Sequence, residues 1–233
     1  MGHVIAIDGP AGAGKSTIAR RLAERLGYTF IDSGAMYRAV ALWALREQTS
    51  LDDAHRLEQL ANAADIELLP LRRVLLNRED VSDAIRAADV SAAASRVAAV
   101  GAVRAALVAK QKHMADRSNV VMEGRDIGTV VFPDARVKIF LDADPTERVR
   151  RRAQEQRDIS PEQLAKQIAE RDDRDRNRAQ SPLVQAPDAV YLDSTGMTPE
   201  EVEEAILKLV RARISNGKAN PDSDPTAVSE SRS

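Results

Sequence analysis

The amino-acid sequence predicts an α/β domain in which a parallel sheet is covered by helices. Short apolar runs alternate with helical patterns over residues 3–46, as expected when the chain returns by a helix after each strand. A glycine-rich turn joins the first strand to the first helix. The chain has 233 residues, 43% of them hydrophobic, which is enough to bury a sizeable core.

The first two strand–helix units are the clearest elements. A buried strand is expected over residues 3–8 and a helix over residues 15–26. A second strand follows over residues 28–32. Ser33-Gly34 then turns into a helix over about residues 35–46.

The middle of the chain departs from this alternation. Residues 52–64 have a helical pattern, and two short strands at 65–69 and 74–77 flank a turn, as in a small antiparallel insert. Residues 95–115 are rich in Ala and Val, and we expect one long helix there.

Three further strands are expected, at residues 119–123, 137–142 and 190–193. The last two enclose a charge-dense helical stretch over about residues 145–178. Thr198 begins the final helix as its N-cap, and this helix runs to about residue 213. Residues 215–233 are rich in Ser, Asp and Pro with almost no apolar residues, which predicts a disordered tail.

Composition excludes several functional classes. A net charge of −2, from 34 basic and 36 acidic residues, provides no global field for nucleic acid or an anionic membrane. Aromatic residues make up 3%, too few for a base-stacking platform. The absence of cysteine excludes disulfides, thiolate metal sites and cysteine nucleophiles. With no leader pattern and no long apolar run, we expect a cytoplasmic protein.

Residues 9–17, Gly-Pro-Ala-Gly-Ala-Gly-Lys-Ser-Thr, match the phosphate-binding loop pattern between a strand and a helix. The glycines let backbone N–H groups approach phosphate oxygens, and the positive end of the helix dipole points at the same anion. Lys15 is placed to reach the β- and γ-phosphates, Ser16 to bind Mg²⁺, and Thr17 to contact the α-phosphate. The expected ATP-binding residues are Gly9, Pro10, Ala11, Gly12, Ala13, Gly14, Lys15, Ser16 and Thr17.

The loop alone does not separate kinases from other phosphate-loop proteins. A GTPase needs Asn-Lys-x-Asp, and the sequence has none. The Asp-x-x-Gly match at residues 193–196 ends the last strand, far from the loop, and we interpret it as chance. The Leu-Ser-Gly-Gly-Gln motif of transporter ATPases is also absent.

Polar residues at two strand ends predict an acceptor site. Carboxyl ends of strands in open α/β sheets face the ligand crevice. Ser33, Tyr37 and Arg38 follow the second strand, and a Glu-Gly-Arg-Asp cluster at residues 123–126 follows the third. For the first group, a helix capped by Ser33 with a solvated Arg38 is an open alternative.

The stretch at residues 170–178 predicts an arginine-lined lid. Arg171, Asp175 and Arg178 share one face of a helix, with Arg174 beside them. A solvated helix laced with salt bridges is the alternative. At the start of this region, we expect some of Arg148, Arg150, Arg151 and Arg152 to cover the ATP and most to be solvated.

The motifs taken together resemble bacterial cytidylate kinases, collinearly over about residues 3–213. The resemblance is carried by residues 32–38 (DSGAMYR), 123–135 (EGRDIGTVVFPDA), 137–142 (VKIFLD), 171–178 (RDDRDRNR) and 192–195 (LDST). It implies transfer of the γ-phosphoryl of MgATP to CMP, and to dCMP, with ADP as the other product. It also implies the nucleoside monophosphate kinase fold: a five-stranded parallel core, an insert in the part that binds the monophosphate, and a mobile helical lid.

The resemblance further implies roles for individual residues. Arg38 and Arg125 should hold the CMP phosphate. Ser95, Arg104, Asp126 and Arg178 should read cytosine, while Arg171 and Asp175 contact the ribose and the transferring phosphoryl. Glu123 stands where relatives often have Asp. The implied CMP-binding residues are Ser33, Tyr37, Arg38, Ser95, Arg104, Glu123, Arg125, Asp126, Arg171, Asp175 and Arg178, and the implied catalytic residues are Lys15, Arg125, Arg171, Asp175 and Arg178.

The implied organisation is one kinase domain over residues 1–214. Its core comprises about 1–32, 96–144 and 180–214, its monophosphate-binding part about 33–95, and its lid about 145–179. Like the family, the chain is expected to be a monomer. Two other functions stay open: a small kinase acting on AMP, UMP, shikimate or a coenzyme precursor, and a nucleotide-binding switch or regulatory ATPase.

Overall fold

The computed structural model describes residues 2–156 and 159–215, so the predicted tail lies outside the described residues except for Ser215. Most predicted elements are present, with shifted ends. In chain order they are β1 (Val4–Asp8), α1 (Lys15–Leu26), β2 (Thr29–Asp32), α2 (Ser33–Arg46), α3 (Ala54–Ala63), β3 (Ile66–Leu69), η1 (Pro70–Arg72), β4 (Arg73–Leu76), β5 (Glu79–Asp80), η2 (Ala84–Arg86), α4 (Ala88–Val97), α5 (Gly101–Ala115), β6 (Val120–Gly124), η3 (Ile127–Val131), β7 (Val137–Asp142), α6 (Pro145–Glu155), α7 (Pro161–Asn177), β8 (Val190–Asp193) and α8 (Pro199–Ser215).

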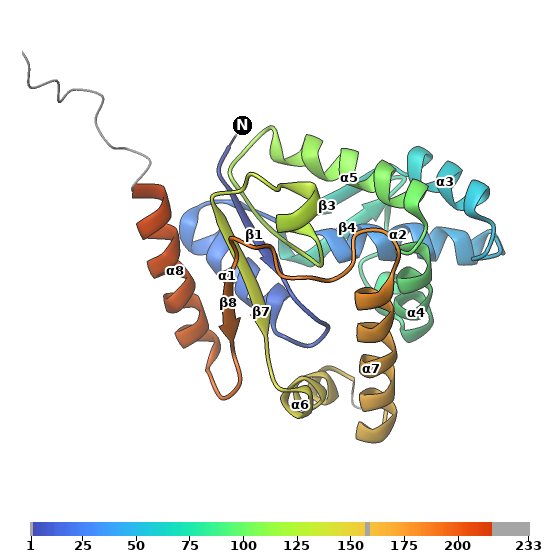
Figure 1. Cartoon of the computed structure of the whole chain (residues 1–233). Helices are drawn as coiled ribbons and strands as arrows, with labels where there is room; N and C mark the ends of the chain where they lie inside the picture. The colour runs from blue at the N-terminus through green and yellow to red at the C-terminus, as the bar shows by residue number, and fades with distance from the viewer. Residues whose placement is uncertain (1, 157–158, 216–233) are drawn as a thin grey trace, which may run out of the picture.

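A five-stranded sheet in the order β2-β6-β1-β7-β8 forms the centre of the molecule (Figure 1). All neighbouring pairs are parallel, which confirms the predicted parallel sheet with flanking helices. Parallel pairing requires crossover connections, and helices supply them. Because β1 lies between β6 and β7, the turn that leaves β1 lies at the middle of the carboxyl edge.

Helices cover both faces of this sheet. On one face Ile5, Ile7 and Leu141 pack with α1 and α8. On the other face Ala6 and Met122 pack with residues of η3 and α5. A strand covered on both faces reads as a continuous apolar run, which is why β1 and β7 were visible in the sequence.

A second layer of structure lies to one side of the sheet. Helices α2, α3, α4 and α5 share an aliphatic core with strands β3 and β4. The strands β3, β4 and β5 form an antiparallel sheet, which confirms the predicted insert and adds the two-residue strand β5.

The prediction of one helix over residues 95–115 is wrong. Helix α4 ends at Val97, α5 begins at Gly101, and their axes differ by 100°. The break coincides with a close contact: a Cβ on Gly101 would lie 2.2 Å from Oε1 of Gln180. Arg104 donates to the carbonyl of Ala98 (3.2 Å), which satisfies one acceptor left free where α4 ends.

The charged stretch forms two helices, α6 and α7, which lie side by side beyond the end of β7 (Figure 1). Ser160 and Gln163 form a reciprocal capping box at the start of α7. Thr198 and Glu201 make the equivalent contacts at the start of α8, as predicted. Over residues 2–156 and 159–215, no single helix is long and apolar enough to cross a membrane, whereas the bent pair α4–α5 passes that test by length and composition alone.

Candidate active site

The phosphate loop joins β1 to α1 in a conformation that needs glycine. Gly12 and Gly14 have φ of 79° and 91°, a region that L-residues with side chains rarely adopt. Gly9 lies against the backbone of β7, where a Cβ would be 1.9 Å from the carbonyl oxygen of Leu141. The loop therefore depends on backbone geometry that these glycines alone permit.

Lys15 is buried at the start of α1 and folds back over the loop. Its Nζ donates to the carbonyl oxygen of Pro10 (2.7 Å). Burial, and then the charges of Arg125 and Arg171, lower the pKa of Lys15 to about 7, although Glu123 and Asp8 oppose the charge effect. Several cations thus lie close together, and a bound polyphosphate would offset the repulsion between them.

A buried ion pair braces the outer part of the loop. Arg148 of α6 and Asp172 of α7 are ion-paired, each with about 5% of its side chain exposed. Arg148 also donates to the Ala11 carbonyl (3.1 Å), and the Ala11 N–H donates to Asp172 (3.4 Å). Helices α6 and α7 therefore hold both backbone polar groups of Ala11.

A second brace joins the loop to the end of β8. Arg151 donates to the Ala13 carbonyl (3.3 Å) and to the hydroxyl (3.0 Å) and carbonyl (2.8 Å) of Ser194. The expectation that most arginines here are solvated is thus wrong for Arg148 and Arg151, which bind loop carbonyls. Arg150 pairs with Glu147 on the surface. Sequence reasoning missed the contacts of these arginines with the loop, because they join residues more than 130 positions apart.

At the end of β2, the helix cap differs from the sequence alternative. Asp32, not Ser33, caps α2: it accepts from the Ala35 N–H (2.9 Å) and pairs with Arg38 (2.8 Å). The Ser33 hydroxyl instead donates to the Glu123 carbonyl (2.7 Å) across to β6. Helix α2 accordingly begins at Ser33, two residues earlier than predicted.

Glu123, the residue before the end of β6, lies directly opposite Asp32 in the strand pairing. Burial and the charge of Asp32 raise the pKa of Glu123, opposed by Lys15 and the Ser16 hydroxyl. Within the described part of the chain its Oε1 has no hydrogen-bond partner. A buried carboxylate oxygen beside the phosphate loop is thus available to bind a ligand.

A compact cluster surrounds Asp126, just beyond β6. Arg104 from α5 pairs with its carboxylate, and Arg178 lies 3.8 Å away on the other side. The Arg104 guanidinium also lies over the Tyr37 ring, 5.4 Å from its centroid. The Ser95 hydroxyl is buried nearby with no hydrogen-bond partner among the described residues.

Helix α7 reaches the end of β6 through Asp175. Arg125 donates to Asp175 (2.8 Å), and although burial opposes it, the charges of Arg125 and Arg171 hold the pKa of Asp175 below its usual range. Burial and the charge of Arg125 lower the pKa of Arg171 to about 10.

Arg178 is the C-cap of α7 with extended backbone, so the prediction that it continues the helix is wrong, although it reaches the same site.

One cavity of about 700 Å³ unites these groups. All eleven residues predicted for the acceptor side line it. Of the loop, Ala11, Gly12, Lys15, Ser16 and Thr17 line it, while Gly9, Pro10, Ala13 and Gly14 do not. The cavity therefore brings the phosphate loop and the residues predicted for the acceptor side together around one space.

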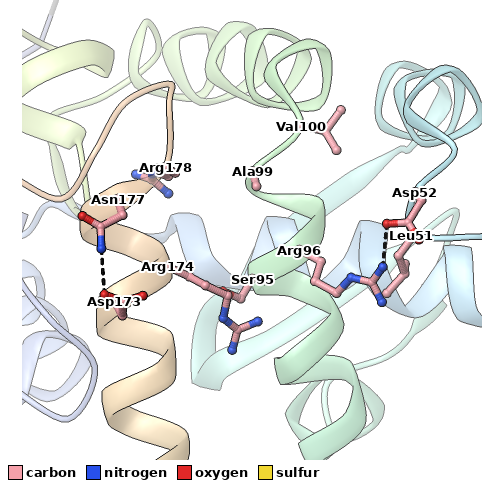
Figure 2. A pocket seen from close by; sticks show the side chains of 10 residues that line it. All are labelled: Leu51, Asp52, Ser95, Arg96, Ala99, Val100, Asp173, Arg174, Asn177 and Arg178. Carbon is pink, nitrogen blue, oxygen red and sulfur yellow. Dashed lines mark hydrogen bonds and ion pairs between the residues drawn. The ribbon is translucent and has the colours of Figure 1, made fainter.

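A smaller pocket of about 540 Å³ opens between α4 and α7 on the outer side of Ser95 (Figure 2). Arg174 extends from α7 towards Ser95, and Arg96 pairs with Asp52 on the far side (2.7 Å). Because Ser95, Arg174 and Arg178 also line the main cavity, this pocket is the outer edge of the same cleft.

Comparisons with known proteins agree with this geometry. The family model described as cytidylate kinase matches residues 5–212. A cytidylate kinase of Solibacter usitatus is 62% identical over 92% of this chain and 95% of its own length. A cytidylate kinase of Desulforamulus reducens is 52% identical over 88% of this chain and 96% of its own length.

A solved structure shows the same fold at low identity. A gluconokinase from Sinorhizobium meliloti superposes with a TM-score of 0.51 at 16% identity, covering 93% of this chain and 95% of its own. The sheet, the cavity at its carboxyl edge and the family match lead to one conclusion. The chain belongs to the cytidylate kinase family.

Proposed function

We propose that this enzyme transfers the γ-phosphoryl of MgATP to CMP, and to dCMP, giving ADP and CDP or dCDP. One observation carries the proposal. The Asp126 carboxylate, flanked by Arg104 and Arg178, lies in the same cavity as Lys15 of the phosphate loop. A pyrimidine acceptor and a triphosphate donor are thereby accommodated together.

The cluster around Asp126 has the donors and acceptors that cytosine needs. Cytosine presents an N4–H₂ donor beside the N3 and O2 acceptors. The Asp126 carboxylate accepts from N4, while Arg178 and the unpartnered Ser95 hydroxyl donate to N3 and O2. Uracil places a carbonyl oxygen against the carboxylate, and this mismatch disfavours UMP.

Arginines between this cluster and the loop suit the phosphates. Arg38 and Arg125 hold the acceptor phosphate, and Lys15 and Arg171 neutralise charge on the transferring group. Phosphoryl transfer requires alignment and charge cancellation more than covalent help, because the acceptor is already a phosphate oxygen. Closure of α6 and α7 excludes water, which otherwise takes the phosphoryl group.

The site also suits Mg²⁺ bound together with the nucleotide. Across the described residues, no group of three or more His, Asp or Glu side chains forms a protein-only metal site. Magnesium in kinases relies on phosphates, water and one or two protein oxygens. Ser16 and the free Oε1 of Glu123 supply such oxygens, and the ion would neutralise charge on the β- and γ-phosphates.

We further propose that the enzyme acts as a cytoplasmic monomer made of one kinase domain. Residues 33–95 form its monophosphate-binding part and residues 145–179 its lid. Size-exclusion chromatography with light scattering tests the monomer, for which we expect one species near 25.4 kDa.

An acceptor screen coupled to ADP production tests the function. With MgATP, CMP and dCMP should turn over far faster than UMP, AMP or shikimate. Faster turnover of one of those other acceptors would assign the chain to another small-molecule kinase. Slow hydrolysis that CMP does not stimulate would indicate a regulatory ATPase instead. Lys15→Ala should lower kcat by orders of magnitude while circular dichroism stays unchanged.

A further inference from the structure

Asp8 is a buried carboxylate for which the proposed reaction provides no role. It is the last residue of β1, directly before Gly9 of the phosphate loop, and it is 5% exposed. Its two oxygens accept two backbone hydrogen bonds, from the N–H of Ile127 (2.8 Å) and the N–H of Gly128 (2.7 Å). Both donors follow directly after Asp126 in the chain.

These contacts begin just beyond the point where strand pairing ends. In the β1–β6 ladder the last pair is Asp8 with Gly124. The chain then leaves the sheet through Arg125 and Asp126, and Asp126 has φ −148° and ψ 25°, in neither strand nor helix. The Asp8 side chain then binds the backbone N–H of Ile127, the residue after Asp126. Arg125 and Asp126 are therefore fixed on one side by the strand pairing at Gly124 and on the other by Asp8.

The charge of Asp8 is matched to this task. Burial, and to a lesser extent the charge of Asp126, raise its pKa to about 6, while the two amide donors and Lys15 favour the ionised form. Above that pH both oxygens accept, as two N–H donors require. An asparagine offers only one acceptor and turns its own NH₂ towards the second N–H donor.

We propose that Asp8 is a positioning residue for acceptor specificity: through the amides of Ile127 and Gly128 it holds the Asp126 carboxylate where cytosine N4 is read. The inference rests on the proposed CMP specificity. Asp8 then influences which base is accepted although it lies outside the base site. It does so from the end of β1, the strand that leads into the phosphate loop.

The test compares CMP and UMP as acceptors at pH 8 for the wild type and Asp8→Asn. Because the Asp126 loop loses one hydrogen bond to a charged acceptor, the ratio of kcat/KM for CMP to that for UMP should fall about tenfold. The KM for ATP should change little, since the loop is separately held by Arg148 and Arg151.

Glu203→Gln is the matched control. Glu203 is equally buried, at 4% exposed, and accepts from Arg21 (2.6 Å) and Arg25 (3.3 Å) on α1, away from the cavity. This variant should lose thermal stability and keep the CMP preference. An Asp8→Asn enzyme that behaves in the same way, less stable with an unchanged ratio, would overturn the proposal.

Gly128→Ala carries the same test if Asp8→Asn does not fold. A Cβ there would lie 3.1 Å from Cδ of Lys138, tighter than ordinary contact, and 3.4 Å from Oδ2 of Asp8. The crowding against Lys138 should displace the Gly128 backbone slightly relative to Asp8 without removing a charge. A smaller fall in the CMP to UMP ratio supports the proposal, and an unchanged ratio contradicts it. A wild type without CMP preference would instead refute the proposed function on which the inference rests.

Discussion

Arg125 at the end of β6 and Asp175 on α7 form an ion pair of 2.8 Å that joins the central sheet directly to the lid. Both side chains are largely buried, with 16% and 8% exposed. Because Arg125 also lines the main cavity, the position of helix α7 and the orientation of this arginine depend on each other.

Asp175→Asn should therefore misplace Arg125 and leave several guanidinium groups to repel one another. We expect kcat for CMP to fall by about two orders of magnitude, as for a displacement of about 1 Å in a reacting complex. Asp173→Asn, on the exposed side of α7, is the control. Equal activity of the two variants would show that the Arg125–Asp175 pair has no part in turnover.

The same ion pair has a defined pH range. The pKa of Asp175 in the folded protein lies below its ordinary value of 3.8, so its contribution to stability is fully present above that value. It is lost as the pH falls through the lower value of the folded state. The difference in the free energy of unfolding between wild type and Asp175→Asn should be constant above pH 3.8 and shrink as the pH falls below it.

ATP binding should be accompanied by proton uptake. With a pKa of about 7, Lys15 is about nine-tenths neutral at pH 8 in the free enzyme, and a triphosphate beside it favours the cation. Isothermal titration in buffers of different ionisation enthalpy should give close to one proton taken up per ATP. Lys15→Arg stays charged and should take up none, whereas wild-type uptake near zero would contradict the expectation.

Asp126→Ala should damage CMP turnover more than UMP turnover. It also leaves Arg104 and Arg178 buried without their anion, which should cost about 3–5 kcal/mol of stability. Asp52→Ala removes the exposed partner of Arg96 and should change neither property measurably. Loss of CMP and UMP turnover in equal proportion would show that Asp126 does not read the base.

The Arg148–Asp172 pair should couple lid and phosphate loop energetically. Arg148→Met and Asp172→Asn should each raise the KM for ATP and destabilise the fold, because each leaves one buried charge unpaired. The double variant should lose much less than the sum of the two. Additive losses in a double-mutant cycle would mean that the two side chains act independently.

Much of the fold was predictable because its signals are local. The buried strands β1 and β7 are apolar runs, and the phosphate loop follows one of them in a recognisable pattern. The break between α4 and α5 was not predictable, since the contact that coincides with it comes from Gln180, 79 positions away from Gly101 in the sequence. Helical propensity over residues 95–115 gave no indication of that contact.

In the candidate site too, the features with local sequence signals were predictable and those set by distant contacts were not. The residues expected to contact ligands were found from motifs and from resemblance, and the structure brings all eleven of the acceptor side and five of the nine loop residues into one cavity. The contacts of Asp8 with Ile127 and of Asp172 with Ala11 were missed because they join a side chain to backbone groups more than a hundred positions away. The one local sign of such a contact was that Asp8, a carboxylate, ends an otherwise apolar strand.

The strand order β2-β6-β1-β7-β8 also bears on how such an enzyme diversifies. The phosphate loop leaves the middle strand β1, whereas Arg38 and Arg125 follow β2 and β6 on one side of it. Three of the groups proposed to read the base, Arg104, Asp126 and Arg178, lie outside residues 33–95. An exchange of residues 33–95 between relatives should therefore leave the choice of base unchanged, whereas changes around Asp126 should alter it.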